Sequence, residues 1–532
     1  MKFFSSLFFA ALLSANNIEV VPFDWGGQFG YLNQGGAIFW NSDWRSNNLL
    51  FDGTWTAYPR MFGPEIEKGF RKKNLDIVIE TDSVGIISNF QYDQGDYLLD
   101  RFGLNLVYSL KKRNTSLHCF KRTYAGSNNQ YSNGSLQPQQ QSYIFNYRSV
   151  KDRNNGGVAL GHFNTSSGYP DSLDRSLIDN RITASNLFWN KGGDRANIKL
   201  LIDYFLQRYK TNHSLALTNK ARYLTRQQYQ LKVDFQLFKY DAVLSLGKNV
   251  RGIKTDDLKS AEWEDLLFQF GKDQIKISTG IFYFENENFI KRSLDIGKTF
   301  DLVNLNLQYN LDYKPNHPYF KSQFPDLSRN YSVIENITGL ITINLKNDKI
   351  YAMFSSINDK SELMNQINED SLTNESSYDR INITYQTNSI PFFDTEINYV
   401  FQEQMGIYSG SLGNWFGLKL KSNFKLFDGF MKIGIDSELK HLQSRTIRAN
   451  FNFIEMVPQN RQNTNSHQPI NIINARITAQ VSRLIIAYEW YNLKELMLGW
   501  LNPDENNYFR VQPEMPALGR QVNLTISWAF QD

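Results

Sequence analysis

The sequence lacks the features of a disulfide-linked, helical-membrane or nucleic-acid-binding protein. It has one cysteine, Cys119, in 532 residues, and disulfide frameworks need cysteines in sets that pair. No apolar run reaches the roughly 20 residues that a membrane-spanning helix requires. The formal net charge is +4, and no basic run exceeds "FRKK" at residues 70–73. We therefore expect no disulfide framework, no transmembrane helix and no nucleic-acid partner.

Linkers are also missing. The 14 prolines are sparse, and no Pro-rich or Gly/Ser-rich stretch divides the chain into the roughly three or four domains that its length would suggest. Aromatic residues make up 14% and the mean hydropathy is −0.46. The chain is too polar for a bundle of membrane helices and too aromatic for a disordered protein.

The N-terminus carries an export signal. Residues 1–15, "MKFFSSLFFAALLSA", place one positive charge before a short apolar run that ends in small residues, which is typical of a secretory signal peptide cleaved after Ala15. We expect the remainder of the chain to be exported.

Strict alternation of polar and apolar residues recurs from about residue 84 to the C-terminus. Examples are "QQYQLKVDFQLF" at 227–238, "LVNLNLQYNLDY" at 302–313 and "QVNLTISWAF" at 521–530. This period of two marks strands with one polar and one apolar face.

Short and long connections alternate between these segments. Turns such as 238–241 and 482–483 are separated by long polar stretches such as 355–377 and 441–468, which is the hairpin pattern of an outer-membrane barrel. A soluble propeller or sandwich would also give many strands, but its connections would not alternate in this way. We predict a large antiparallel transmembrane β-barrel of about 22 strands, with a margin of about four. Its last strand ends on the aromatic Phe530, the kind of end that the barrel-assembly machinery reads.

The segment behind the signal resembles the end of the plug domain of TonB-dependent outer-membrane receptors. The matching elements are Ile18-Glu19-Val20-Val21, Phe29-Gly30 and Gly35-Gly36-Ala37-Ile38. The family usually has Arg-Gly-Pro after the Val pair, where this chain has Pro22-Phe23-Asp24. The resemblance implies a plug-like remnant over residues 16–83, periplasmic or lumenal, and a barrel over 84–532. The segment is much shorter than a full plug, and no energy-coupling box stands before Ile18. In one alternative interpretation, the glycines merely serve tight turns. In another, the gene model starts too late and the plug is missing from it.

The polar faces of the expected strands are the candidate functional surface. If the apolar faces meet lipid, the residues that line the lumen are Asn197, Lys199, Asp203, Lys232, Asp234, Asn304, Asn306, Gln308, Asn310, Lys419, Lys421, Lys432, Asp436, Arg476, Gln480, Asn523 and Thr525. Charges of both signs are mixed with amides, which suits hydrated neutral or zwitterionic solutes better than one sign of ion. The alternative is that these side chains pair with one another and fill the interior.

Catalytic and metal-binding motifs are not found. The sequence has no Gly-x-Ser-x-Gly elbow, phosphate-binding loop or His-Glu-x-x-His, and the adjacent His118 and Cys119 would point to opposite faces of a strand. We predict no enzyme, cofactor or metal, although barrel enzymes exist. Acidic clusters in expected external loops suit a solvated surface better than calcium. Their members are Asp256, Asp257, Glu262, Glu264 and Asp265, and Asp359, Glu362, Glu369, Asp370, Glu375 and Asp379.

The sequence thus predicts an outer-membrane channel or transporter of a Gram-negative bacterium that passes small solutes. With only a plug remnant, passage would be passive and porin-like. With a plug supplied by a second chain, uptake would be energised by a TonB-type partner. A third reading makes the barrel an anchor for loops that bind a surface or a partner.

Overall fold

The structure is a computed structural model, and it describes residues 18–22, 30–34, 37–39, 85–126, 139–168, 177–193, 195–212, 219–272, 274–315, 331–363, 372–402, 413–446, 449–452, 457–460, 466–495, 497, 510 and 518–531. Among these residues, no helix is long and apolar enough to cross a membrane.

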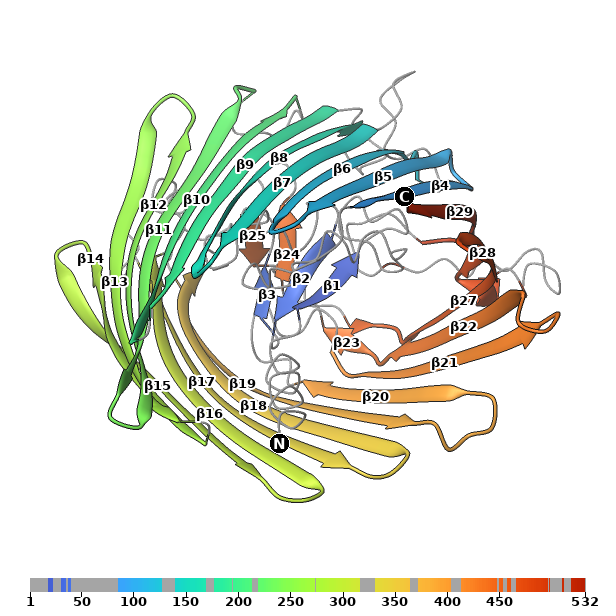
Figure 1. Ribbon diagram of the computed structural model, residues 1–532. Helices are drawn as coiled ribbons and strands as arrows, with labels where there is room; N and C mark the ends of the chain where they lie inside the picture. The colour runs from blue at the N-terminus through green and yellow to red at the C-terminus, as the bar shows by residue number, and fades with distance from the viewer. Residues whose placement is uncertain are drawn as a thin grey trace.

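A closed barrel of 22 antiparallel strands forms most of the molecule (Figure 1). In chain order its strands are β4 (Gly85–Gly95), β5 (Leu99–Leu110), β6 (Arg113–Thr123), β7 (Gln139–Lys151), β8 (Asn154–Gly168), β9 (Leu177–Gly192), β10 (Ala196–Thr211), β11 (Arg222–Leu237), β12 (Tyr240–Lys254), β13 (Leu258–Lys272), β14 (Ile275–Phe284), β15 (Glu287–Thr299), β16 (Val303–Pro315), β17 (Tyr331–Asn344), β18 (Asp348–Leu363), β19 (Leu372–Thr387), β20 (Asp394–Gln402), β21 (Trp415–Leu426), β22 (Met431–Leu442), β27 (Ile470–Val481), β28 (Leu484–Tyr491) and β29 (Gln521–Gln531). The predicted fold class and strand number are confirmed.

The barrel closes between its last and first strands. β29 pairs with β4 in the register Thr525↔Asp93 and Phe530↔Ser88, so every barrel strand has a neighbour on both sides and no strand edge of the ring is left open. The predicted terminal strand that ends near Phe530 is therefore the strand that closes the barrel.

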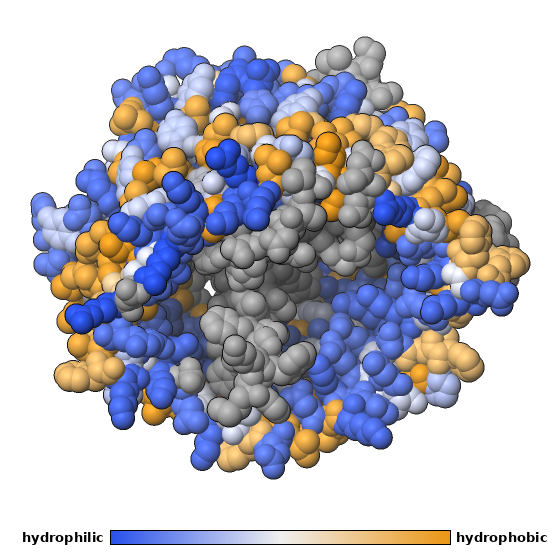
Figure 2. Space-filling model, in the orientation of Figure 1, coloured by the Kyte–Doolittle hydropathy of each residue, from blue (hydrophilic) through white to orange (hydrophobic). Residues whose placement is uncertain are grey.

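The two faces of the strands differ in chemistry, as the alternation predicted. Large apolar side chains are exposed on one face, for example Leu231 at 38% and Ile277 at 53%, and Figure 2 shows apolar residues in orange on the outer surface of the wall. Neighbouring residues along a strand point to opposite sides, and the residues on the other face are mostly polar. We call these two surfaces the apolar face and the polar face of the barrel.

Short turns join the strands at the rim where β4 begins and β29 ends. Examples are residues 238–239 and 482–483, in which Phe238 and Ser482 have positive φ. At the opposite rim most connections are long, as expected. Three are short, however, namely 96–98, 255–257 and 285–286, so the alternation of loop lengths is less regular than the sequence analysis assumed.

Several strands extend into stretches that the sequence analysis assigned to loops. β18 and β19 occupy much of the expected loop 355–377, and β13 includes Glu262, Glu264 and Asp265. The assignment of both acidic clusters to loops was therefore wrong for most of their members. Polar residues occupy both faces of the strand in much of these stretches, so the alternation that marks a strand is lost there.

A separate three-stranded sheet forms from the N-terminal segment. It consists of β1 (Ile18–Pro22), β2 (Gly30–Gln34) and β3 (Ala37–Phe39), with β2 in the middle. In the view of Figure 1 this sheet lies within the outline of the ring of barrel strands. Two small hairpin sheets arise between β22 and β27, where β23 (Arg445–Thr446) pairs with β26 (Ser466–His467) and β24 (Ala449–Asn452) with β25 (Val457–Asn460).

Candidate functional site: the polar face of the barrel

The register places all the predicted lumen residues on one continuous face of the barrel. Paired residues in neighbouring strands share a face, and the predicted residues connect through pairs such as Lys199↔Lys232, Lys421↔Asp436 and Asp436↔Arg476. The asparagines and Gln308 of β16 join the same face through Gln308↔Asp295. Asn523 joins it through Glu489↔Asn523, and Thr525 through Thr525↔Asp93. The sequence pattern thus identified one surface rather than scattered positions.

Ion pairs and hydrogen bonds cross between strands on this face. Asp234 accepts contacts from Lys199 at 3.3 Å and from Lys232 at 3.5 Å, and Asn186 donates a hydrogen bond to Asp203. Asn306 Nδ2 donates to Asp295 Oδ1 at 2.8 Å. Some of the predicted lumen residues therefore pair with one another. The alternative in which side chains fill the interior required such pairs.

Around the closure, the polar face is nearly inaccessible to solvent. Asp93 and Arg101 form an ion pair with 0% and 2% of their side chains exposed, and Asn523 and Thr525 are each 1% exposed. Arg122 Nε donates to Gln140 Oε1 at 2.6 Å in the same sector. Buried charges persist only when paired and hydrogen-bonded, so this sector is a packed part of the wall.

Burial also affects a carboxylate outside the strands. Removal from water raises the pKa of Glu495 above its ordinary value, an effect that the nearby Arg520 opposes. Asn492 Nδ2 donates to Glu495 Oε2 at 3.2 Å. These contacts fasten the connection after β28 to the residue just before β29.

A group of aromatic side chains adjoins the polar face on the β13–β17 side. Trp263, Phe282 and Phe284 are buried and pack against Phe289, Tyr313 and Tyr331. The Lys291 ammonium lies 5.1 Å from the centre of the Phe282 ring and contacts Asp265 at 2.5 Å and Asp312 at 2.9 Å. The charge triad of Lys291, Asp265 and Asp312 therefore lies beside Phe282 of this aromatic group.

The polar face is open at the short-turn rim of β10 to β14. A cavity of about 510 Å³ lies there. It is lined by Gly193, Arg195, Ala196, Asn197, Lys232, Asp234, Phe235, Gln236, Asp241, Ala242, Val243, Gln269, Gly271 and Lys276. Three of the predicted lumen residues, Asn197, Lys232 and Asp234, are among them, so part of the cavity lining was predicted from the sequence.

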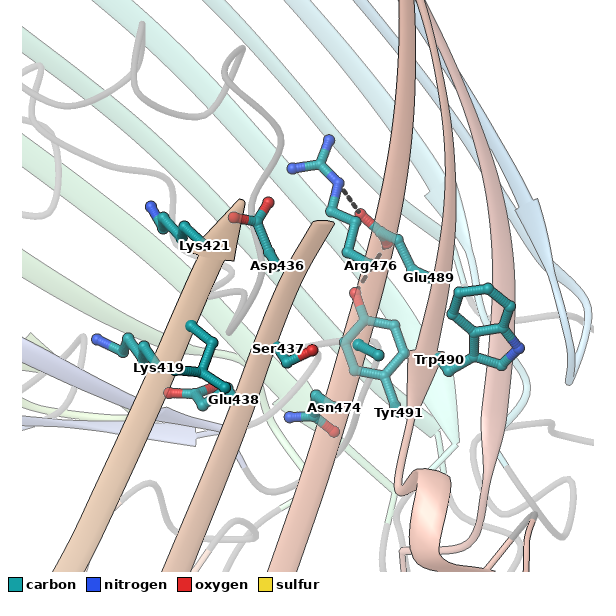
Figure 3. Close-up of a pocket in the computed structure, with 12 residues that line it drawn as sticks. Lys419, Lys421, Asp436, Ser437, Glu438, Asn474, Arg476, Glu489, Trp490 and Tyr491 are labelled. Atoms are coloured by element: carbon teal, nitrogen blue, oxygen red, sulfur yellow. Dashed lines mark hydrogen bonds and ion pairs between the residues drawn. The ribbon is translucent and has the colours of Figure 1, made fainter. Parts of the chain in front are cut away.

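A second hollow, of about 50 Å³, lies in the wall of β21, β22, β27 and β28 (Figure 3). Leu420, Ser437, Ala475 and Trp490 are paired in one row across these strands, and the two small residues in the middle of the row leave the space. Figure 3 shows Trp490 directed away from the side to which Lys419 and Lys421 point. This row belongs to the apolar face, so the hollow is not part of the polar surface.

Most of the residues that carry the plug resemblance belong to the N-terminal sheet. Ile18, Glu19, Val20 and Val21 form most of β1, and Gly30 opens β2. Val20 pairs with Leu32, which pairs in turn with Phe39. Gly35 and Gly36 lie outside the described residues.

The sequence analysis missed several residues of the polar face. Asp241, Gln269 and Lys276 line the cavity, and Glu489 faces Arg476. Alternation carried from Lys232 across each turn would have found them. Their segments, such as "YDAVLSLGKN" at residues 240–249, alternate less strictly than the three that were used. Within the described part of the chain, no three His, Cys, Asp or Glu side chains come together as a metal site.

No protein-family model matches the chain, and no curated protein matches it significantly. Solved structures match it in shape. The copper transporter OprC has a TM-score of 0.69 at 9% identity over 98% of this chain and 96% of that one. A mutant of the ferric enterobactin receptor PfeA from Pseudomonas aeruginosa has a TM-score of 0.66 at 8% identity, over 98% and 96%. The ferric yersiniabactin uptake receptor FyuA from Yersinia pestis has 0.64 at 10%, over 96% and 93%.

This likeness shows a shared fold. These neighbours are receptors and transporters, not enzymes, and the barrel fold that the N-terminal resemblance implied is confirmed. A closed antiparallel barrel of 22 strands with exposed apolar residues on one face is a bacterial outer-membrane barrel. The predicted location is therefore confirmed at the level of the fold.

Proposed function

We propose that this chain conducts small hydrophilic solutes across the bacterial outer membrane. The observation that supports this proposal best is the single polar face formed by all the predicted lumen residues around a closed ring of 22 strands. Side chains fill barrels of about eight strands, whereas larger barrels enclose channels or a plugged lumen. The apolar face meets lipid and the polar face lines the lumen.

Residues 16–83 act as a plug-like segment inside the barrel of residues 84–532, behind a signal peptide of residues 1–15. The sheet β1 to β3, which lies within the outline of the ring in the view of Figure 1, supports this division. The lumen carries mixed charges and amides, which favours hydrated neutral or zwitterionic solutes over one sign of ion. We propose no catalytic role and no resident cofactor. The barrel-assembly machinery recognises the closing strand that contains Phe530.

A second candidate is energised, ligand-specific uptake with a TonB-type partner. The shared fold with a copper transporter and with receptors for ferric enterobactin and ferric yersiniabactin favours it. Such uptake requires a lumen that is closed at rest, so the resting conductance of the barrel separates the two mechanisms.

Single-channel conductance in planar bilayers tests the proposal. The refolded full-length chain is compared with a variant that lacks residues 16–73. Large, steady conductance of the full-length chain supports passive passage. A closed full-length barrel that opens in the shortened variant favours a working plug and energised uptake. Two closed barrels would contradict a solute path through the lumen.

A further inference from the structure

The 510 Å³ cavity at the short-turn rim holds two opposite charges in one row of residues. Asp241 of β12 pairs with Gly271 of β13, which pairs with Lys276 of β14. Two strand spacings separate the outer members of the row, or about 10 Å between their backbones. Gly271 has no side chain, so the space between the carboxylate and the ammonium group stays open.

Glycine is required at the middle of this row. A Cβ atom at Gly271 would overlap the carbonyl oxygen of Ile275 and would lie 2.7 Å from the Cα of Lys276. Real Cβ atoms do not approach backbone that closely, so the tight hairpin between β13 and β14 keeps the gap free of a side chain.

Among the described residues, the charges on either side of the gap differ from the neighbouring Asp234 in their ion pairs. One row further in, Asp234 contacts both Lys199 and Lys232. Among the described residues, by contrast, no ion pair joins Asp241 or Lys276 to another side chain. Amide side chains of Asn197, Gln236 and Gln269 line the same cavity. Arg195 is a further cation of the lining. The cavity thus offers an anionic acceptor in Asp241, cationic donors in Lys276 and Arg195, and neutral hydrogen-bonding groups.

We infer that this cavity is a subsite for a small zwitterionic solute, such as a free amino acid or a short peptide with both termini free. Its ammonium group would face Asp241 and its carboxylate would face Lys276, each in a charge-assisted hydrogen bond. A simple cation would meet Lys276 and Arg195, and a simple anion would meet the Asp241 carboxylate, so only a ligand that carries both signs gains from the charges at both ends of the row. The inference rests on the proposed solute path and names a solute class for it.

Equilibrium dialysis of the refolded full-length chain in detergent micelles tests the subsite, with radiolabelled diglycine as the zwitterion. The uncharged comparison is the N-acetylated, C-amidated form of diglycine. We expect retention of diglycine and none of the blocked form at low ionic strength, where screening is weak. Asp241→Asn and Lys276→Gln should each weaken diglycine binding by about tenfold or more, because each removes one charge-assisted bond.

A charge exchange and a matched control separate recognition from damage to the fold. The double variant Asp241→Lys with Lys276→Asp should restore binding relative to either single variant, because the solute binds in the reverse direction. Lys425→Gln removes a lysine from the polar face of β21, outside the cavity, and should bind diglycine like the natural chain. Three results would each overturn the subsite. The first is equal binding of blocked and free diglycine, and the second is binding to the single variants as strong as to Lys425→Gln. The third is an exchange variant that binds diglycine no better than the single variants.

The conductance of the same preparation tells apart failure of the subsite and failure of the solute path. Open channels that do not retain diglycine would overturn the subsite and leave the pore in place. Retained diglycine in a closed barrel would support the subsite and contradict passive passage.

Discussion

Arg476 and Glu489 face each other across β27 and β28, with the arginine Nε 3.3 Å from Oε1 of the carboxylate. Tyr491 donates its hydroxyl to Oε2 of the same carboxylate at 2.9 Å. Glu489 is 3% exposed at its side chain, against 22% for Arg476. Both carboxylate oxygens are therefore used, and the pair joins the strands next to the closure of the barrel (Figure 3).

We expect Glu489→Ala to destabilise the barrel by about 2–3 kcal/mol, because it leaves the partly buried Arg476 without this partner. Unfolding in urea of the protein refolded into lipid vesicles, followed by tryptophan fluorescence, measures the loss. Lys419→Ala is the matched control. It breaks the contact of Lys419 with Glu396 at 3.0 Å, in which the lysine side chain is 48% exposed, so a loss of about 0–1 kcal/mol is expected. Equal losses in the two variants would contradict a special role for the Arg476–Glu489 pair.

The sequence predicted the barrel because every strand that crosses the lipid has one face toward lipid and one toward the lumen. Successive residues of such a strand therefore alternate between apolar and polar. It did not predict where strands end. β18 runs to Leu363 and β19 begins at Leu372, in a stretch where polar residues occupy both faces and the alternation disappears. The open row of Asp241 and Lys276 was also out of reach, because it depends on register across three strands. Alternation gives the face of a residue but not its partner.

The assignment of faces predicts opposite responses at two adjacent residues of β11. Leu231 is on the apolar face, 38% exposed, and Lys232 is on the polar face. Leu231→Lys should destabilise the barrel by about 2–4 kcal/mol, since a charge would meet lipid near the middle of the membrane. Lys232→Leu should change stability little. Urea unfolding in lipid vesicles measures both, and the reverse order would show that the faces had been exchanged.

Gly157 should be intolerant of a side chain, because the ring of Phe188 covers it. A Cβ atom there would lie 2.5 Å from the carbonyl oxygen of Tyr147 and 2.6 Å from Cε1 of Phe188. We expect Gly157→Ala to cost about 1–3 kcal/mol through overpacking. At Gly339 an added Cβ would meet nothing within 4 Å, so Gly339→Ala should cost nothing measurable. A Gly157→Ala barrel as stable as Gly339→Ala would mean that Phe188 does not pack on this glycine.

The lysines of β21 should influence which ions the open barrel prefers. Lys419 and Lys421 are exposed on the polar face, where their charges act on ions in a watery lumen. The double variant Lys419→Gln with Lys421→Gln should shift the reversal potential in a KCl gradient toward cations, more strongly at low salt because screening is weaker there. Lys248→Gln is the matched control. That lysine is on the other face of the wall, in contact with Glu262, and its loss should leave the reversal potential unchanged. A shift of the same size in both variants would mean that ions sense the outer surface of the barrel as strongly as its lumen, and the polar face would then not be the conducting path.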